Sequence, residues 1–350
     1  MKDVITNGFQ GTRPKNLACV LNAITRIGIG PRTAVIGGKA MDKILDRLPE
    51  PYYKTEYGAA YLGDALDLMK HIPDSSINLI MTSPPFALNK KKPYGNVASN
   101  VYVEWFRPFA DQFWRMLKND GSLVIHIGGS WEKGRPTRSL YHLELLFDLC
   151  HNNDREFYLA QDFYWFNPAK LPAPAEWVTV RRVRAKDAVD PIWWLSKSPF
   201  PKSDNRRVLA PYSKAMLRLI EQGYNAGLRP SGHNISLKFQ IDNGGAIPPN
   251  LLAIANTESN GKYLASCRKS NVAPHPARYP LALPEFFIKF LTEDGDIVLD
   301  PFGGSNSTGE AAEKSRRHWL CFETDQEYLG TSRFRFEHAT EHESSLISTH

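Results

Sequence analysis

Residues 296–310 read Asp-Ile-Val-Leu-Asp-Pro-Phe-Gly-Gly-Ser-Asn-Ser-Thr-Gly-Glu, a pattern typical of an α/β fold. The apolar run that ends at Asp300 predicts a buried strand, and the residues after the glycines predict a helix. Gly303 and Gly304 would let the backbone of the intervening turn approach a ligand closely. In an open α/β sheet such a turn lies at the crevice outside the carboxyl ends of the strands, where ligands bind. A plain tight turn is the alternative.

The ligand that this turn predicts is a nucleoside rather than a dinucleotide or ATP. The glycines do not form Gly-x-Gly-x-x-Gly, and no Gly-Lys-Ser/Thr follows to hold phosphates. A further strand at 318–322 ends at Glu323, whose carboxylate could accept hydrogen bonds from a ribose diol. The order of strand, glycine turn, helix, strand and acid favours the ligand site over the plain turn.

A second motif, Ser83-Pro84-Pro85-Phe86, follows the apolar run at 76–81. Neither of two adjacent prolines has a backbone N–H to donate to a sheet or a helix, so the segment should be extended and stiff. Such a loop suits a flipped nucleobase, because Ser83 and the Pro84 carbonyl can accept from an exocyclic amino group while Phe86 stacks on the ring. Taken alone, the motif could also be an ordinary loop.

With these two motifs in this order, the sequence resembles the β class of DNA amino-methyltransferases that use S-adenosylmethionine, and within it the PvuII-type site-specific cytosine-N4 methyltransferases. The resemblance covers roughly residues 57–336. It implies a Rossmann-like α/β fold, with a mostly parallel sheet and an inserted DNA-recognition region. Further matching motifs are Ala87-Leu88, Lys91-Lys92, Tyr94-Gly95-Asn96, 162–168, 229–233, 242–245 and 275–278.

The resemblance also implies roles for particular residues. Ser83, Pro84, Pro85 and Phe86 would be catalytic, and serine at the first position favours cytosine N4 over adenine N6. Asp64 would lie near the adenine of S-adenosylmethionine, although it could equally cap the helix that follows it. The other residues expected around this cofactor are Asp300, Phe302, Gly303, Gly304, Ser305, Glu323 on the ribose, and His275 near the methionine end, where a plain His-Pro turn is the alternative.

His126 departs from the family pattern. It lies at the end of the predicted strand 122–127, where the PvuII-type enzymes have an acidic residue thought to aid catalysis. Imidazole titrates near neutral pH, so His126 could replace that carboxylate and tune the pH profile of the reaction. A structural histidine at a strand end is the alternative.

The four cysteines argue against two other kinds of chemistry. Methylation at cytosine C5 requires an attacking cysteine, and Cys19, Cys150, Cys267 and Cys321 lack the Pro-Cys context suited to that role. They also lack metal-ligand spacing, which predicts that the protein binds no metal. Scattered cysteines without a secretion signal suit reduced thiols in the cytosol. No apolar run approaches the roughly 18 residues that suggest a membrane span.

Positive charge is concentrated in the middle of the chain. Residues 171–272 carry 15 Lys and Arg against 7 Asp and Glu, a balance of +8, whereas the whole 350-residue chain carries +6. A basic segment between two α/β halves suits a region that reads double-stranded DNA. A solvated surface is the alternative for each single charge. The expected DNA-binding residues are Arg181, Arg182, Arg184, Lys186, Arg206, Arg207 and His233, together with Lys90, Lys91 and Lys92 beside the catalytic loop.

The pattern divides the chain into five parts. Residues 1–56 form an extension of unknown role with a short helix at 41–48. Residues 57–170 form the catalytic half of the methyltransferase domain, with strands at 77–81 and 122–127 and a helix at 103–117. Residues 171–272 form the target-recognition region, 273–336 the cofactor-binding half and 337–350 a polar tail.

Three functions compete at this stage. The first is a cytosine-N4 DNA methyltransferase, the modification enzyme of a restriction–modification system, with CAGCTG as the implied target and a separate endonuclease as partner. The second is an adenine-N6 methyltransferase of similar fold. The third is a DNA-binding regulator without catalytic activity, disfavoured because both motifs are intact. An RNA substrate is disfavoured because no RNA module is recognisable. The active form could be a monomer or a homodimer.

Overall fold

The computed structural model describes residues 36–88, 95–223, 227–228, 230–232, 234–235, 241–257, 261–336 and 340–341. Gly37 onward forms one structural unit. The described residues contain a ten-stranded sheet with the order β11-β7-β8-β4-β3-β12-β13-β2-β1-β14. Its strands are β1 Tyr53–Lys54, β2 Gly58–Leu62, β3 Ile77–Thr82, β4 Leu117–His126, β7 Tyr158–Phe166, β8 Val189–Ser196, β11 Leu251–Ala253, β12 Ile297–Asp300, β13 His318–Glu323 and β14 Thr340–Glu341.

The centre of the sheet is parallel. Strands β4, β3, β12, β13 and β2 lie side by side in this order and pair in parallel with one another. Strand β8 pairs antiparallel with both β4 and β7, and β1 pairs antiparallel with β2 and β14. This confirms the mostly parallel α/β sheet that the sequence predicts.

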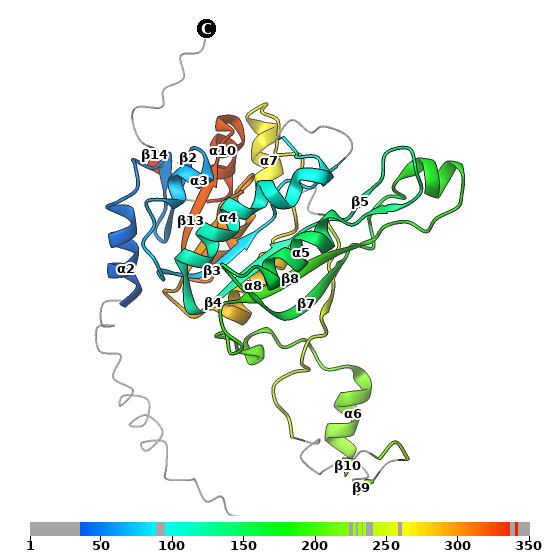
Figure 1. The fold of residues 1–350 in the computed structure, drawn as a ribbon. Helices are drawn as coiled ribbons and strands as arrows, with labels where there is room; N and C mark the ends of the chain where they lie inside the picture. The colour runs from blue at the N-terminus through cyan, green and yellow to red at the C-terminus, as the bar shows by residue number, and fades with distance from the viewer. Residues whose placement is uncertain are drawn as a thin grey trace, which may run out of the picture. The chain divides into compact units, whose positions relative to one another are not determined.

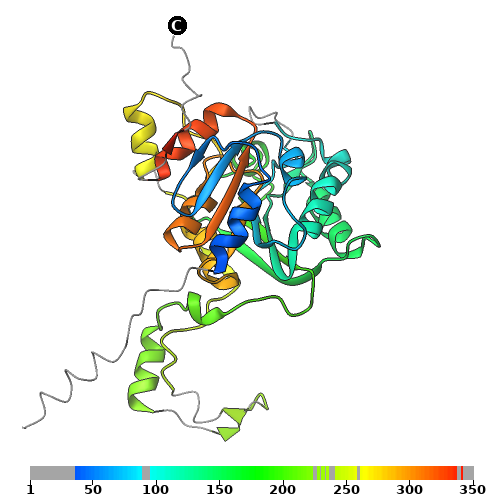
Figure 2. The ribbon, with the colours of Figure 1, turned by 90° about the vertical axis from the view of Figure 1, so that its left-hand side faces the viewer.

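Helices cover both faces of the sheet (Figure 1). Turned by 90°, Figure 2 shows α4 and α5 on one side, and α8, α9 and α10 on the other. The helices are α2 Ile36–Leu45, α3 Ala65–Met69, α4 Tyr102–Met116, α5 Tyr141–His151, α6 Lys214–Gln222, α7 Lys262–Lys269, α8 Ala282–Leu291, α9 Ser307–Lys314 and α10 Gln326–Ser332. Two short hairpins pair β5 Ser130–Trp131 with β6 Arg138–Ser139 and β9 Gly227–Leu228 with β10 Asn234–Ile235.

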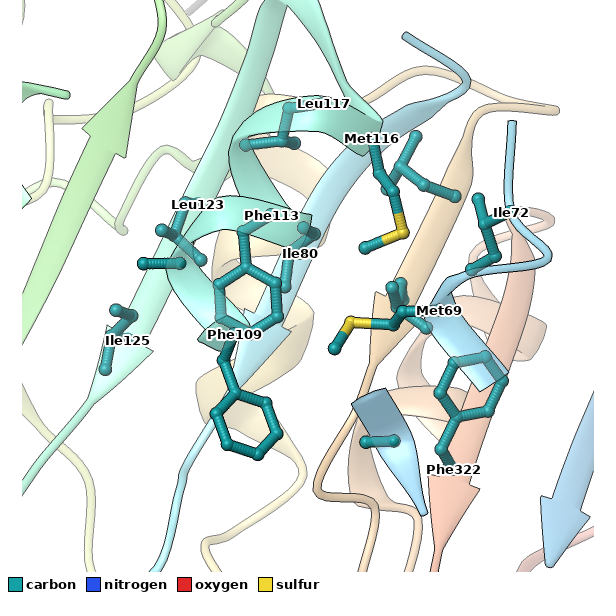
Figure 3. Close-up of a cluster of buried hydrophobic side chains, with 14 of the residues drawn as sticks. Met69, Ile72, Ile80, Phe109, Phe113, Met116, Leu117, Leu123, Ile125 and Phe322 are labelled. Atoms are coloured by element: carbon teal, nitrogen blue, oxygen red, sulfur yellow. The ribbon is translucent and has the colours of Figure 1, made fainter. Parts of the chain in front are cut away.

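Each central strand is buried on both faces. Leu299 of β12 belongs to the cluster that includes Phe113 of α4, whereas Val298 belongs to the cluster on the opposite face, with Phe287 of α8. Figure 3 shows the first cluster, where Phe109, Phe113 and Met116 pack against the strands. Alternate side chains thus enter opposite layers, which explains why these strands read as continuous apolar runs.

The carboxyl ends of five strands carry the motifs of the sequence. Strand β3 ends directly before Ser83, β4 ends at His126 and β13 ends at Glu323. Strand β12 leads into the glycine turn, and β2 ends two residues before Asp64. Because these five strands are parallel, their carboxyl ends share one edge of the sheet, where ligands bind in open α/β folds.

Two expectations about the elements differ from the structure. The helix expected at 41–48 begins earlier, at Ile36, and ends at Leu45. Strands β8 and β11 fall within 171–272, yet both belong to the main sheet. Strand β8 is pulled into it because the run from Ile192 to Leu195 is buried against β4 and β7. The expected boundary at 170 therefore cuts the sheet.

Within the described ranges, no helix is both long enough and apolar enough to cross a membrane.

Candidate active site

A cavity of 860 Å³ lies at the carboxyl edge of the parallel strands. Its size is in the range of pockets that bury small-molecule ligands. Most residues predicted for catalysis and cofactor binding meet here: Asp64, Ser83, Pro84, Pro85, Phe86, His126, His275, Phe302, Gly303, Gly304, Ser305 and Glu323.

Contacts with α4 and with Gly128 fix the position of the Ser-Pro-Pro-Phe loop. The hydroxyl of Tyr102, a fully buried residue of α4, donates to the Pro85 carbonyl at 2.8 Å. The Phe86 ring lies against Gly128, where a Cβ atom would come within 2.5 Å of the ring. Helix α4 thus holds the backbone of the loop, and the Phe86 ring occupies space that is free because residue 128 is a glycine.

His126 faces the loop from the end of β4. Its Nδ1 atom lies 3.0 Å from Ser83 Oγ, and its Nε2 atom lies 3.9 Å from Asp190 Oδ2. The imidazole is buried, with its ring centroid 5.4 Å from that of Phe86 and 5.3 Å from that of Trp165. The structure therefore brings His126 into contact with the Ser-Pro-Pro-Phe loop.

The glycine turn needs its glycines for space. A Cβ atom at Gly303 would lie 2.1 Å from Cys321 Sγ. Gly304 has φ +51°, and a Cβ atom there would lie 3.2 Å from the His275 imidazole. Its backbone N–H donates to Glu323 Oε2 at 2.7 Å, which joins the turn to the end of β13.

Glu323 is held in place with acceptor capacity to spare. Its carboxylate accepts the backbone N–H groups of Gly304, Thr324 and Asp325. Burial raises the pKa of Glu323 above its usual range, while these backbone hydrogen bonds oppose the rise. The Thr324 hydroxyl also donates to Oε1, at 3.4 Å, so three of the four donors are on Oε1. Oε2 accepts only from Gly304, and a lone-pair position therefore remains on that oxygen for a ligand hydroxyl.

Asp300 forms hydrogen bonds with residues around the glycine turn but does not line the cavity. It is 2% exposed and accepts hydrogen bonds from Thr82 Oγ1 at 2.8 Å and Thr308 Oγ1 at 2.6 Å. The Phe302 N–H and the Tyr279 hydroxyl also donate to it. Burial raises the pKa of Asp300 to about 6 despite these four bonds. Its place in the structure is that of a positioning residue.

Asp64 occupies both of the positions considered for it. Its Oδ1 atom accepts from the Leu66 N–H at 2.8 Å, which makes Asp64 the N-cap of α3, and Asp64 also lines the cavity.

Phe302 packs on Phe109 of α4, with ring centroids 5.0 Å apart. His275 is largely buried, which lowers the pKa of its imidazole.

A basic finger, defined as residues 130–139 and 167–188, borders the cavity. Figure 1 shows the two segments projecting together beside the label β5. Asp187 joins them, because it accepts from Trp131 Nε1 at 2.8 Å and pairs with Arg138 at 2.5 Å. The finger carries eight Lys and Arg against three Asp and Glu. Four predicted DNA-binding residues, Arg181, Arg182, Arg184 and Lys186, belong to it.

Arg206 and Arg207 lie elsewhere. Arg207 donates to the Thr292 carbonyl and pairs with Glu293, just before the start of β12 and so at the edge of the sheet opposite the cavity. Arg206 pairs with Asp204 at 2.8 Å. The structure does not bring these two arginines to the candidate site. Lys90, Lys91, Lys92 and His233 lie outside the described residues.

Several lining residues were not predicted from the sequence. Trp165 and Asn167 fall within one of the matching motifs, which was a signal for them. Nothing in the local sequence of Trp131, Arg138, Lys170, Asp187 or Asp190 indicates a site, because their position depends on how the finger folds against the sheet. In the part of the chain that the structure describes, no group of three or more His, Cys, Asp or Glu residues could hold a metal ion.

Comparisons with known proteins agree with this geometry. The family model described as DNA methylase matches residues 77–333. The type II methyltransferase M.PvuII of Proteus hauseri is 53% identical over 82% of this chain and 86% of its own length. M.ScaI of Streptomyces caespitosus is 24% identical over 86% of this chain and 89% of its own.

Among solved structures, that of the PvuII DNA methyltransferase (cytosine-N4-specific) is similar. It matches with a TM-score of 0.68 and 46% identity, covering 83% of this chain and 89% of that one. The resemblance inferred from the motifs is thereby confirmed. The chain belongs to the DNA methylase family, as a relative of the PvuII-type enzymes.

Proposed function

We propose that this chain is a site-specific DNA methyltransferase that uses S-adenosylmethionine to methylate the N4 amino group of a cytosine flipped out of duplex DNA. The observation that carries the proposal is the meeting of two motifs from distant parts of the sequence, the Ser-Pro-Pro-Phe loop and the glycine turn, in one cavity. The relative of similar structure is named as cytosine-N4-specific.

The cavity fits the cofactor on chemical grounds. Gly303 and Gly304 present bare backbone, and Glu323 retains acceptor capacity for a ribose diol. Phe302 and Asp64 line the same side and suit an adenine ring and its amino group. When bound, S-adenosylmethionine supplies a methyl group on a sulfonium, which bonds to N4 as the carbon–sulfur bond breaks and its electron pair stays on sulfur.

The protein's own residues have to orient a poor nucleophile. The lone pair of cytosine N4 is delocalised into the ring, so acceptors that hold its hydrogens favour a pyramidal nitrogen. Ser83 and the Pro84 carbonyl are the proposed acceptors, Phe86 the stacking surface and His126 the group that takes the released proton. The anchored loop and the buried imidazole support these roles because the Tyr102–Pro85 and Ser83–His126 contacts are already made in the structure.

The basic finger is the proposed DNA-facing surface. Arg181, Arg182, Arg184 and Lys186 would replace counterions along the phosphates beside the cavity. We assign Lys90, Lys91 and Lys92 the same role around the flipped base, and His233 a contact in the target-recognition region, on sequence grounds alone. Arg206 and Arg207 are left out, since the contacts of Arg207 with Thr292 and Glu293 place them at the edge of the sheet opposite the cavity.

The biological setting follows from the same relatives. We propose that the chain modifies DNA for a restriction–modification system and that an endonuclease acting separately shares its target. The palindrome CAGCTG, implied by the resemblance, is the first target to test. A monomer could methylate such a palindrome one strand at a time.

The test is product identification. The purified protein is incubated with S-adenosylmethionine and either a CAGCTG duplex or a duplex of equal composition carrying CTGCAG, and the nucleosides are identified by mass spectrometry. We expect N4-methylcytosine in the first duplex only. N6-methyladenine would move the reaction to the other amino group, and no methylated base in any DNA, genomic DNA included, would contradict the proposal.

A further inference from the structure

Four polar side chains form a line that starts at the catalytic loop and ends at the base of the finger. Ser83 Oγ lies 3.0 Å from His126 Nδ1, and His126 Nε2 lies 3.9 Å from Asp190 Oδ2. Both carboxylate oxygens of Asp190 accept from Lys170 Nζ, at 2.9 and 3.0 Å. Ser83 directly follows β3, His126 ends β4, Lys170 lies four residues after β7 and Asp190 is the second residue of β8. All four line the cavity.

The imidazole is left with one unused nitrogen. His126 Nε2 is buried and makes no hydrogen bond in the structure. Asp190 Oδ2, at 3.9 Å, is in position to accept its proton after a shift of about 1 Å, and catalytic hydrogen bonds are often long before the substrate binds. A buried N–H without a partner is costly, so that shift is favourable.

We propose that Asp190, itself held by Lys170, keeps the proton of neutral His126 on Nε2, so that Nδ1 faces Ser83 as a proton acceptor. Asp190 is thus a positioning residue. PvuII-type enzymes have a carboxylate at the position of His126, at the end of β4, and in this chain the carboxylate comes instead from Asp190 of β8. This inference rests on the proposed function of the cavity.

The proton balance follows from this arrangement. As N4 bonds to the methyl carbon it becomes cationic and releases one proton to Ser83 Oγ. Ser83 passes its own proton to His126 Nδ1, so the hydroxyl is regenerated and the imidazole becomes an imidazolium. The Asp190 carboxylate stabilises that cation until the proton leaves to solvent, the same division of labour as in a Ser-His-Asp triad.

The neighbouring groups keep Asp190 charged. Burial alone would raise the pKa of Asp190, but His126 and Lys170 outweigh it and hold the pKa below its usual range. Among the described residues, Tyr279 also faces the imidazole, and burial raises its pKa well above its usual value, so it stays neutral. The rings of Phe86 and Trp165 make edge-to-face contacts with the imidazole.

The first test reads the tautomer without any reaction. Nitrogen NMR of histidine-labelled protein, with the His126 signals assigned by their loss in His126→Asn, distinguishes Nε2–H from Nδ1–H. We expect Nε2–H in the wild type and a mixture in Asp190→Asn, whose amide can accept from or donate to the ring. Asp162→Asn makes the same substitution at a carboxylate of β7 that is bonded to Tyr164, and should leave the His126 signals unchanged. Nδ1–H in the wild type would overturn the proposal.

The second test uses the pH dependence of single-turnover methyl transfer. Protonated His126 cannot accept a proton from Ser83, so we expect the rate to fall at low pH and give the pH profile an acidic limb. Asp190→Asn removes a negative neighbour and should move that limb about one unit to lower pH, with a plateau rate lower by about 10-fold or more. Lys170→Met removes a positive neighbour and should move the limb to higher pH.

These opposite shifts separate the outcomes. A purely structural role would lower the melting temperature or raise KM without moving the limb in either variant, and would overturn the inference. If Asp190→Asn does not fold, the Lys170→Met shift and the wild-type tautomer still decide. Inactive wild-type protein on all DNA would instead contradict the proposed function, while the tautomer measurement stands by itself.

Discussion

At the scale of the residue, the lack of a side chain at Gly128 determines where the Phe86 ring can lie. Its position allows the Phe86 ring to lie where a Cβ atom would be 2.5 Å away. The carbonyl of Gly128 also accepts from the buried Tyr141 hydroxyl, so the backbone cannot retreat easily. The stacking surface proposed for the flipped cytosine is therefore positioned by a residue outside either motif.

Gly128→Ala should displace Phe86 and slow catalysis. The added methyl group overpacks the site, at a cost of about 1–3 kcal/mol in stability, and a ring shifted by about 1 Å can reduce the rate on the order of 100-fold. Single-turnover rates at saturating DNA and cofactor would measure this, with calorimetry showing unchanged cofactor affinity. Gly38→Ala in α2, where a Cβ atom meets nothing within 4 Å, is the control and should keep the wild-type rate. Equal rates in both variants would disprove the positioning role.

Prediction from sequence succeeded where function depends on a local motif. The backbone of the glycine turn and the stiffness of Pro84-Pro85 are encoded in consecutive residues, so both were visible. Asp190 and Gly128 contact His126 and Phe86, which are distant from them in sequence. The residues next to Asp190 and Gly128 in the chain do not predict these contacts. Arg206 and Arg207 lie away from the cavity for a reason that their local sequence does not give. Arg207 pairs with Glu293, which is distant in sequence and lies just before β12, while Arg206 pairs with the neighbouring Asp204.

At the scale of the element, the basic finger is built to present charge. Arg181 stacks 5.2 Å from the Trp177 ring and pairs with Glu176, while Arg184 donates to the Pro136 carbonyl in the other segment. These contacts fix the finger's own backbone but leave its surface rich in unshared positive charge. Such a surface binds phosphates with a strong dependence on salt.

Replacing Arg181 and Arg182 by Gln should weaken DNA binding most at low salt. If each contacts one phosphate, the slope of log affinity against log salt should fall by about 1.8. Fluorescence anisotropy with a CAGCTG duplex at several salt concentrations measures the slope. The matched control is the pair Arg206→Gln and Arg207→Gln, which removes the same charge at the opposite edge of the sheet and should leave the slope unchanged. If both pairs lower the slope equally, net charge and not the finger determines binding.

At the scale of the whole molecule, Asp300 joins the two halves of the fold. Thr82 reaches it from the first half of the chain, and Thr308 and Tyr279 reach it from the second. The strands that carry Thr82 and Asp300 are neighbours in the sheet although 218 positions separate the two residues in sequence. A single buried carboxyl group therefore connects the end of β3, just before the Ser-Pro-Pro-Phe loop, with the glycine turn and the helix α9 after it.

This carboxyl group should make stability depend on pH in an unusual direction. Its pKa rises from 3.8 to about 6 on folding, because burial disfavours the charge. The folded state thus binds the proton more tightly than the unfolded state, and its stability falls as the pH rises from about 4 through about 6. The shift corresponds to about 3 kcal/mol. Most carboxylates act in the opposite sense, so the effect has to be isolated by difference.

Urea unfolding of the wild type and of Asp300→Asn between pH 4 and 7 isolates it. The asparagine does not titrate, so the wild-type stability minus that of the variant should decrease over this range by about 3 kcal/mol. Thr308→Val removes one donor to the carboxylate and should move the wild-type transition to higher pH. A difference that stays flat, or that grows as the pH rises, would mean that Asp300 is stabilised as an anion and that its four donors outweigh its burial.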